Sequence, residues 1–327
     1  MGPVGEFRDL QYYSARQGFP AYGILYISGY GGEIKAFSTL NGTLLWTYNN
    51  TNSGTGTPWG LYPTHISAIA DGVVYAFSGE HSPNKPLYHG YRTRAIDAFT
   101  GEELWTLKGW SASGLGTTLA PIAIADGFLT YYNLYDGQIY TVGKGPSATT
   151  ILIQNDVITE GESVLVKGSV MDIAAGTKQN GQEARFPNGV PAVSDESMTS
   201  WMEYVYMQQP RPTEATGVEV TLSVFDPNKN TYDIGTVTSD SNGMYKLLWE
   251  PPVPGEYTVY AHFDGSEGYR PSYAETAVAV LNALPPETQP ETPQSMTDAY
   301  VIAGVAAIII VIVIVGAVIL LFLRKRP

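Results

Sequence analysis

Four histidines are the residues of this chain best suited to metal binding or acid–base chemistry: His65, His81, His89 and His262. No two of them stand at the i, i+4 spacing that places two imidazoles on one helix face around a zinc ion. His81 and His89 share a Gly/Pro-rich stretch, GEHSPNKPLYHGY, and one interpretation is that they bind a shared metal ion. The other interpretation, which we expect, is that both are solvated side chains of a loop.

The chain contains no cysteine. This excludes a disulfide framework, a thiolate metal site, a cysteine nucleophile and an iron–sulfur cluster. The sequence also lacks a phosphate loop, a nucleophile elbow and an HExxH zinc motif. A pair of catalytic carboxylates would leave no such signature, because its members meet only in the fold. From these patterns we expect no bound cofactor and no metal.

Aromatic and histidine side chains gather in two segments rich in Gly, Pro and polar residues, 49–62 and 80–92. Such segments form loops, and loops on a rigid scaffold carry many binding residues. The sequence predicts a ligand-contact site there, with packing between structural repeats as the alternative for its TPWGLY part. The candidate contact residues are Trp59, Tyr62, His81, Tyr88 and His89.

Two Asn-X-Thr sequences could accept a glycan, and they begin at Asn41 and Asn49. Asn41 is followed by Gly42, and an Asn-Gly pair is a strong signal for the tip of a β-hairpin. A hairpin tip is exposed, so Asn41 is expected to be accessible. Both asparagines are glycosylation candidates.

The C-terminus carries the strongest single pattern in the chain. Residues 301–323 are apolar at 21 of 23 positions, and a helix of that length is roughly 34 Å long, enough to cross a bilayer. We place a transmembrane helix at 300–323 and a basic cytoplasmic tail at 324–327. Arg324, Lys325 and Arg326 follow the helix at once, so the positive-inside rule predicts a single-pass protein of the cell membrane with its N-terminal bulk extracellular.

The first 30 residues contain no signal peptide, since four charged residues interrupt them and no apolar run exceeds Ile24–Ile27. An extracellular domain must be exported, so we expect that Met1 is not the true start of the gene product. The alternative is a tail-anchored protein with its bulk in the cytosol. That topology would carry the three basic tail residues across the bilayer, against the charge rule.

The N-terminal half contains an internal repeat. IKAFSTLNGTLLW ends at Trp46 and TRAIDAFTGEELW ends at Trp105, an offset of 59 residues. A second register, offset by about 50, links segments at Gly23, Asp71 and Asp126. Each unit alternates in polarity between tight turns, which predicts short antiparallel strands. Units of this length with several strands each are typical of propeller blades.

Residues 95–105, AIDAFTGEELW, resemble the AxDxxTGxxxW repeat of the pyrroloquinoline-quinone (PQQ) type β-propellers. Residues 36–46 match it less closely, and residues 135–141 lack the tryptophan. The resemblance covers about residues 20–145 and implies about three blades of a partial propeller within 1–147, with Trp46 and Trp105 packing between blades. Three blades cannot close a ring, which again leads us to expect further N-terminal sequence.

The same resemblance implies a quinoprotein dehydrogenase as an alternative function, with a quinone on the propeller axis beside Ca²⁺ and a catalytic Asp. Those enzymes need a complete ring of blades and usually adjacent cysteines, and this chain has neither. Asp97 lies inside the repeat motif, where a hydrogen bond that stabilises the turn is expected. We expect no catalysis and assign no catalytic residue.

A second domain is predicted at 148–282, because strands such as VEVTLSV and GEYTVYA alternate cleanly and the blade signature ends. It resembles the immunoglobulin-like or prealbumin-like modules of prokaryotic surface proteins, which implies an antiparallel β-sandwich. An insert at 174–216 contains a predicted amphipathic helix capped by Ser194, with Trp201 and Val205 on its apolar stripe. That stripe either packs on the sandwich, which we expect, or binds a partner. The Pro-rich residues 283–299 form a spacer.

The fold class predicted is therefore mainly β: a partial PQQ-like propeller, a β-sandwich with a helical insert, and one transmembrane helix. Removing the tail leaves 15 basic and 31 acidic residues, so a nucleic-acid partner is not expected. The bilayer is one predicted partner, and an extracellular protein or glycan is the other. We expect a membrane-anchored surface protein that binds or scaffolds without catalysis. The alternatives are the quinoprotein dehydrogenase and an envelope protein assembly factor.

Overall fold

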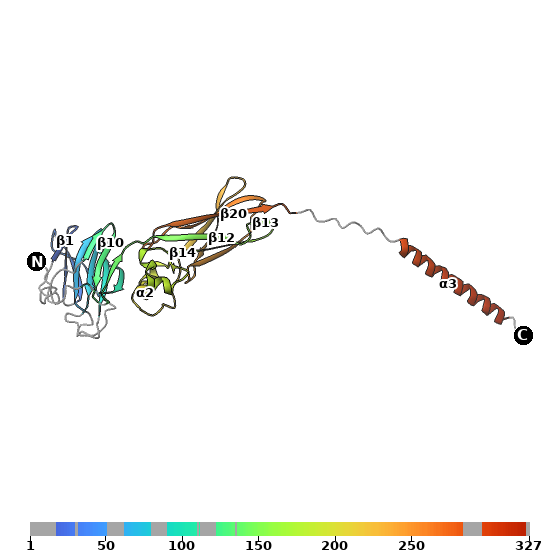
Figure 1. Ribbon diagram of the computed structural model, residues 1–327, viewed down its shortest axis with the longest axis horizontal. Helices are drawn as coiled ribbons and strands as arrows, with labels where there is room; N and C mark the ends of the chain where they lie inside the picture. Colours follow the sequence, from blue (N-terminus) through green and yellow to red (C-terminus); the bar gives the residue numbers. More distant parts are fainter. Residues whose placement is uncertain are drawn as a thin grey trace. The chain divides into compact units, whose positions relative to one another are not determined.

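The computed structural model describes residues 18–29, 32–50, 62–79, 90–109, 111, 122–134, 136–283 and 296–324. The chain forms two compact units, residues 1–281 and 282–327. Within these residues, the first unit is mainly β, with five sheets that are antiparallel in all but one strand pair, and the second contains a single helix. Figure 1 traces these elements along the chain.

The N-terminal half of the first unit consists of three antiparallel meanders, in which each strand pairs with the next one along the chain. Sheets 1 and 2 have four strands each, and sheet 3 has three. Sheet 1 contains β1 (Gly18–Ala21), β2 (Ile24–Ser28), β3 (Glu33–Ser38) and β4 (Leu44–Asn49). Sheet 2 contains β5 (Thr64–Ala70), β6 (Val73–Ser78), β7 (Arg92–Asp97) and β8 (Glu103–Lys108), and sheet 3 contains β9 (Ile122–Ala125), β10 (Phe128–Asn133) and β11 (Gln138–Val142).

The repeated sequence produces repeated local structure. The first hairpin of each sheet turns through a residue and a glycine that both have positive φ: Tyr22-Gly23, Asp71-Gly72 and Asp126-Gly127. Two consecutive positive φ values define the type I′ turn, whose twist matches that of the flanking strands. The tryptophan repeat is also equivalent in space, because Trp46 pairs with Ala36 and Trp105 pairs with Ala95, each beside a register shift.

Apolar side chains join the three sheets in series. One buried cluster combines Tyr26 and Ile34 of sheet 1 with Val74 and Ile96 of sheet 2. Another combines Phe77 of sheet 2 with residues of sheet 3 that include Leu129 and Tyr131. The sheets therefore pack face to face in chain order. They do not close into a ring within the described residues, so their assignment as propeller blades is taken up below as a proposal.

The C-terminal half of the first unit is a sandwich of two sheets. Sheet 4 places β14 between β12 and β18, with short β15 beside β14, and sheet 5 has the order β13-β20-β19-β16-β17. One pair, β13 with β20, is parallel, whereas an entirely antiparallel sandwich was expected. The strands are β12 (Ser147–Ile153), β13 (Val157–Thr159), β14 (Val164–Asp172), β15 (Val190–Pro191), β16 (Glu219–Phe225), β17 (Thr231–Thr238), β18 (Met244–Trp249), β19 (Gly255–Phe263) and β20 (Ser272–Leu281).

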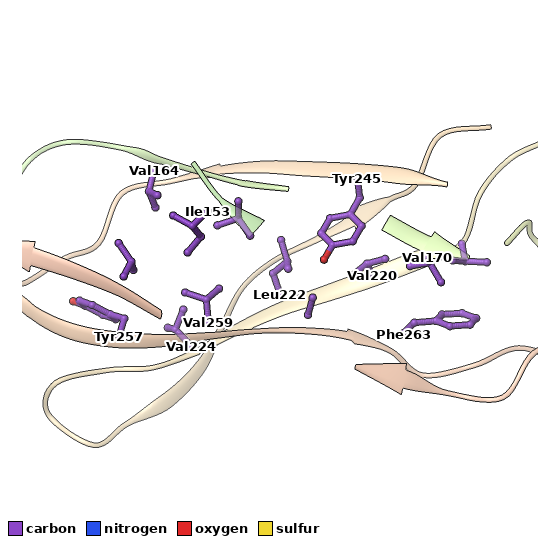
Figure 2. Packing of buried hydrophobic residues seen from close by; sticks show 14 of the residues in the cluster. Ile153, Val164, Val170, Val220, Leu222, Val224, Tyr245, Tyr257, Val259 and Phe263 are labelled. Carbon is purple, nitrogen blue, oxygen red and sulfur yellow. The ribbon is translucent and has the colours of Figure 1, made fainter. Parts of the chain in front are cut away.

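Apolar residues on the inward faces of these strands fill the space between sheets 4 and 5. Val164, Val166 and Val170 of β14 face Val220, Leu222 and Val224 of β16 and the apolar residues of β19 in a single core (Figure 2). Most of these side chains are less than 5% exposed, and each fully buried aliphatic residue stabilises the fold by roughly 1.5–3 kcal/mol relative to an exposed one. This core is the largest buried cluster of the described residues.

The insert contains a 3₁₀ helix, η2 (Ala175–Lys178), followed by α1 (Asn180–Arg185) and α2 (Asp195–Tyr206). The apolar stripe of α2 packs inward: Trp201 and Val205 are fully buried, and Met198 also contacts the sandwich core. The stripe is thus used within the chain and is not an exposed binding surface. Ser194 is the N-cap residue, but its hydroxyl bonds to Thr216 rather than to a free N–H of the helix.

The second unit contains α3 (Met296–Leu323), a 28-residue helix that begins inside the predicted spacer, just after Gln294 and Ser295. None of its residues is buried, and its composition and length would allow it to cross a membrane. Asp298 lies in its first turn, where a carboxylate is favoured by the helix dipole. The helix is consistent with a single-pass anchor in a bilayer.

Candidate functional site

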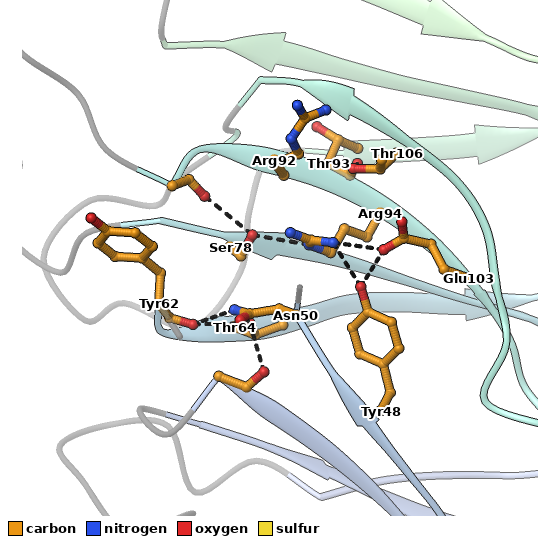
Figure 3. Close-up of polar contacts among 12 residues, drawn as sticks. Tyr48, Asn50, Tyr62, Thr64, Ser78, Arg92, Thr93, Arg94, Glu103 and Thr106 are labelled. Atoms are coloured by element: carbon orange, nitrogen blue, oxygen red, sulfur yellow. Dashed lines mark hydrogen bonds and ion pairs between the residues drawn. The ribbon is translucent and has the colours of Figure 1, made fainter. Parts of the chain in front are cut away.

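A buried ionic network lies between sheets 1 and 2, and Arg94 is at its centre. The Arg94 side chain is fully buried, and its Nη1 is 2.6 Å from Oε2 of Glu103 and 2.7 Å from the hydroxyl of Tyr48. Its Nε donates to Ser78 at 3.1 Å, and Tyr48 donates to Glu103 (Figure 3). A charge removed from water must be paired and hydrogen-bonded, and these four side chains meet that requirement.

The same region holds the ends of the two loop segments that the sequence singles out. Asn50 precedes residues 51–61 and Tyr62 follows them, and Nδ2 of Asn50 donates to the carbonyl of Tyr62. Ser78 and Gly90 flank residues 80–89, and the Ser78 hydroxyl donates to the Gly90 carbonyl at 3.2 Å. Ser78 also accepts from Arg94, so the base of the second segment belongs to the Arg94 network (Figure 3). The base of the first segment lies beside it, because Thr64 is the cross-strand partner of Ser78 and the N–H of Gly79 donates to the carbonyl of Pro63 at 3.0 Å.

Of the five candidate ligand-contact residues, Trp59, His81, Tyr88 and His89 lie outside the described residues. Tyr62 is described, and it is only 4% exposed. Its ring lies so close to Gly90 that a Cβ there would come within 2.1 Å of the ring. Tyr62 therefore anchors the base of a loop through packing, and a ligand contact at the other four residues stays a prediction.

Trp46 connects sheet 1 to sheet 2. It is 9% exposed, and its Nε1 donates to the carbonyl of Ala98 at 3.1 Å. Its ring covers Gly101, where a Cβ would come within 2.7 Å of ring carbons. Trp105, the equivalent residue of sheet 2, lies in the cluster that joins sheet 2 to sheet 3. Both tryptophans thus lie between consecutive sheets.

Both glycosylation candidates are exposed. Asn41 lies in the turn between β3 and β4, and its Oδ1 accepts from the backbone N–H of Thr43 at 3.1 Å and from the Thr43 hydroxyl at 2.8 Å. The Nδ2 atom that would carry a glycan takes part in neither bond. Asn49 is the last residue of β4 and pairs with Glu33. Modification of either residue stays a prediction.

Asp97, the aspartate of the repeat motif, holds a turn. Its Oδ1 accepts from the N–H of Phe99 at 2.8 Å, from the N–H of Thr100 at 2.7 Å and from the Thr100 hydroxyl. These backbone bonds lower the pKa of Asp97. Within the described ranges, no three His, Asp or Glu residues are grouped as they would be around a metal ion.

The network can position neighbouring segments. Burial raises the pKa of Tyr48, and the nearby Glu103 carboxylate raises it further, so its hydroxyl stays protonated and continues to donate. The Arg94 charge is balanced by Glu103 and is closed off from solvent. The arrangement links sheet 2 to Tyr48 of sheet 1 and holds the ends of residues 80–89.

A second junction joins the meander sheets to the insert of the sandwich. Glu203 of α2 accepts from Nη1 of Arg92 at 2.7 Å and from the backbone N–H of Lys108 at 2.8 Å. The Lys108 ammonium donates to Gln209 at 2.8 Å. The N–H of Lys108 lies on the outer edge of β8, so Glu203 occupies a position at which another strand could pair.

The chain segment that leads from sheet 3 into the sandwich is also fixed. Gly145 forms an isolated parallel bridge with Tyr269. Its N–H donates to the carbonyl of Gly268 at 2.9 Å, and its own carbonyl accepts from the N–H of Arg270 at 2.8 Å. The junction therefore combines side-chain contacts from α2 with backbone bonds at the connecting segment.

The contacts that Arg94 and Glu203 make between elements were not predicted from the sequence. Arg94 immediately precedes the repeat motif, and an arginine on an otherwise apolar face of a predicted strand is the signal that could have identified it. Glu203 offers no comparable signal, because a glutamate on the polar side of an amphipathic helix is ordinarily solvated.

No family model matches the chain, and no curated protein matches it. Solved structures give distant similarities. The adhesin InvE of Yersinia pseudotuberculosis is 12% identical with a TM-score of 0.27, covering 77% of this chain and 55% of InvE. BamB of Moraxella catarrhalis is 12% identical with a TM-score of 0.24, covering 72% of this chain and 71% of BamB.

A europium-containing methanol dehydrogenase is 15% identical with a TM-score of 0.22, covering 48% of this chain and 22% of the enzyme. The chain thus spans about a fifth of that enzyme and about half of InvE. At these TM-scores the similarities carry no argument about function, and what this chain does must be inferred from its own residues.

Proposed function

We propose that this protein is a single-pass surface protein that binds or scaffolds without catalysis, with sheets 1–3 as PQQ-like propeller blades. The segments 51–61 and 80–89 form its contact site for an extracellular protein or glycan, and the C-terminal tail lies in the cytoplasm. The observation that carries the proposal is that the bases of the two segments are both fixed and lie side by side. Asn50 bonds to Tyr62, Ser78 bonds to Gly90, and the N–H of Gly79 donates to the carbonyl of Pro63 between them.

Several features support this proposal. A rigid base reduces the conformational entropy that a loop loses on binding, so an anchored pair of loops is suited to recognition. The 28-residue α3 supports membrane anchoring, and the basic residues after it support an outward-facing bulk. The buried, charge-balanced Arg94 supports a scaffold rather than a reactive group.

Topology is tested by treating intact cells that express the full chain with an external protease. We expect cleavage of residues 1–281 while a C-terminal tag remains protected, with a cytosolic protein as the control for cell integrity. Complete protection of residues 1–281 would contradict the outward orientation.

The contact site is tested by screening the full chain, in detergent or nanodiscs, on a glycan array and against candidate surface proteins. We expect Trp59→Ala to weaken binding about tenfold or more, as removal of an aromatic anchor does. The matched control is Phe99→Ala, which removes an aromatic ring that is 55% exposed in a different turn. Equal binding by both variants, or reduction of a redox dye in the presence of quinone and Ca²⁺, would contradict the proposal.

A further inference from the structure

The outward face of sheet 4 carries two adjacent lysines among exposed leucines. Lys167 on β14 and Lys246 on β18 are direct cross-strand partners. Leu152 lies beside Lys167 on β12 and is 57% exposed, and Leu248 is 66% exposed. We call this surface the lysine face; it consists of Thr150, Leu152, Leu165, Lys167, Ser169, Met244, Lys246 and Leu248.

Two like charges directly opposite each other destabilise a sheet. Neither lysine ammonium forms a hydrogen bond or ion pair with any residue that the structure describes. The part of the chain before the basic tail, which we call the ectodomain, has about twice as many acidic as basic residues. None of its described carboxylates is paired with Lys167 or Lys246. An anionic partner would relieve this repulsion, and apolar groups on that partner would cover the leucines.

The opposite side of the same sandwich has the complementary character. On the outward face of sheet 5, Asp233, Ser223, Tyr260 and Glu275 form one cross-strand row. The next row ends in His262 and Tyr273. We call this surface the acidic face; it consists of Glu219, Thr221, Ser223, Phe225, Asp233, Thr236, Tyr260, His262, Tyr273 and Glu275.

The acidic face also offers apolar area next to its charges. The ring of His262 stacks between Tyr260 and Tyr273, with centroids 5.9 Å apart on each side. Tyr273 is 67% exposed. The carboxylates of Asp233 and Glu275 form no ion pair with the residues of the described ranges. Each sandwich therefore presents cations with leucines on one side and carboxylates with aromatic rings on the other.

We propose that the lysine face of one copy docks on the acidic face of a second copy in the same membrane. The two surfaces differ, so the contact is head to tail, and each copy keeps one free face of each kind. A head-to-tail contact without closure extends into a row of molecules. Sheets that pack face to face lie about 10 Å apart, a spacing that lysine side chains can bridge.

The proposal rests on membrane anchoring, which is part of the proposed function. Each ectodomain has a net negative charge, so two copies in dilute solution repel each other. A face three or four strands wide is also small for a stable interface. Confinement to a bilayer raises the effective concentration, which favours a weak contact that forms in concentrated solution but not in dilute solution.

Cross-linking in vesicles tests the proposal, and the absence of native cysteine makes each introduced thiol unique. Full-length L248C and T236C proteins are reconstituted separately and together and treated with a short bismaleimide. We expect a cross-linked dimer in the mixed vesicles and only background in vesicles that hold one variant alone. Self-cross-linking of L248C as strong as that of the mixture would overturn the head-to-tail contact.

Charge reversal provides a second test of the head-to-tail contact. Adding K167E and K246E to the L248C protein should lower the yield in mixed vesicles on the order of tenfold, because attraction becomes repulsion. Adding D233K and E275K to its T236C partner should restore the yield. The matched control is the pair K178E and K229E, which makes the same charge change at exposed residues elsewhere. Equal loss in the control, or no rescue, would overturn the proposal.

Vesicle flotation separates this proposal from the proposed function. Protein that floats with vesicles but gives no cross-linked dimer retains its anchor and overturns self-association alone. Protein that does not float overturns the anchor, and the two thiol variants are then mixed at high concentration in solution. Absence of the cross-linked dimer there would overturn self-association as well.

Discussion

At the scale of single residues, Arg94 illustrates how a polar group can hold two sheets together. Its guanidinium is bonded to Glu103, Tyr48 and Ser78, so all three side chains lose a hydrogen-bond or ion-pair partner if Arg94 is replaced. Removal of one member of a buried ion pair is costly, because the remaining charge has lost its partner. Arg94 therefore provides a direct test of the network.

We predict that Arg94→Met lowers the free energy of unfolding by about 2–4 kcal/mol, as measured by denaturant titration of the full chain in detergent. The double variant R94M/E103Q should recover part of this loss, because it leaves no unpaired carboxylate at the site. A loss in the double variant as large as in R94M would show that the charge of Glu103 is irrelevant.

Asp172 provides a second residue-level prediction, because it is 5% exposed and burial raises its pKa. A carboxyl whose pKa is raised by folding contributes stability at low pH and loses that contribution as pH rises through the folded pKa. Asp172→Asn should therefore be more stable than the wild type at neutral pH, since the amide oxygen can still accept from the N–H of Ala174.

The pH dependence of this difference is the decisive measurement. The stability advantage of D172N should shrink as pH falls below the ordinary range of an aspartate, where the wild-type carboxyl is protonated in both states. Thermal unfolding of both proteins across that range measures it. An advantage that stays constant with pH would rule out ionisation of Asp172 as its cause.

At the scale of elements, the repeat offers a pair of equivalent glycines in different surroundings. Gly42 and Gly101 have φ values of 75° and 78°, so an alanine is strained equally at both. A Cβ at Gly42 would meet nothing within 4 Å, whereas at Gly101 it would strike Trp46. We predict a loss of about 1 kcal/mol for Gly42→Ala and of about 2–4 kcal/mol for Gly101→Ala.

Tryptophan fluorescence distinguishes the two mechanisms, since displacement of Trp46 should change its emission in G101A and not in G42A. If both variants lost the same stability and kept the same emission, the packing of Trp46 on Gly101 would contribute nothing beyond backbone strain. This comparison tests the contact between sheets 1 and 2, of which the hydrogen bond from Trp46 to Ala98 is a part.

The elements also show what the sequence could predict. Local rules succeeded where a residue acts on its neighbours. The Asn41-Gly42 turn, the Asp97 turn and the apolar stripe of α2 all follow from spacing and side-chain chemistry. The parallel pairing of β13 with β20 was missed, because the choice of strand partner depends on residues more than a hundred positions away.

At the scale of the whole molecule, the junction at Glu203 makes a prediction about cooperativity. Glu203→Ala leaves the Arg92 guanidinium and the Lys108 N–H without their acceptor, at a cost of about 2–3 kcal/mol. We expect residues 1–281 to unfold in one thermal transition in the wild type and in two transitions in E203A. The matched control is Glu196→Ala, an exposed glutamate of the same helix, which should change stability by less than about 0.5 kcal/mol.

The candidate site was only partly predictable at this scale. The sequence indicated which loop segments carry aromatic residues. It could not indicate that Asn50 would join the ends of one segment, or that Ser78 would connect the ends of the other to the Arg94 network. That network depends on how sheet 1 stacks on sheet 2, and stacking is decided by buried surfaces rather than by any local motif. The pairing of Lys167 with Lys246 could not be predicted from a local motif either, since 79 residues separate them in sequence.

The connection at Gly145 has a mechanical consequence. Because its N–H and carbonyl bond to Gly268 and Arg270, a tensile load that pulls on sheet 3 passes into the sandwich through a short stretch of backbone ladder. Bonds of this kind loaded along the strand direction must break together, which resists force better than sequential unzipping. If the chain is held at both ends, tension would thus pass between sheets 1–3 and the sandwich, and the segment at Gly145 would not extend first.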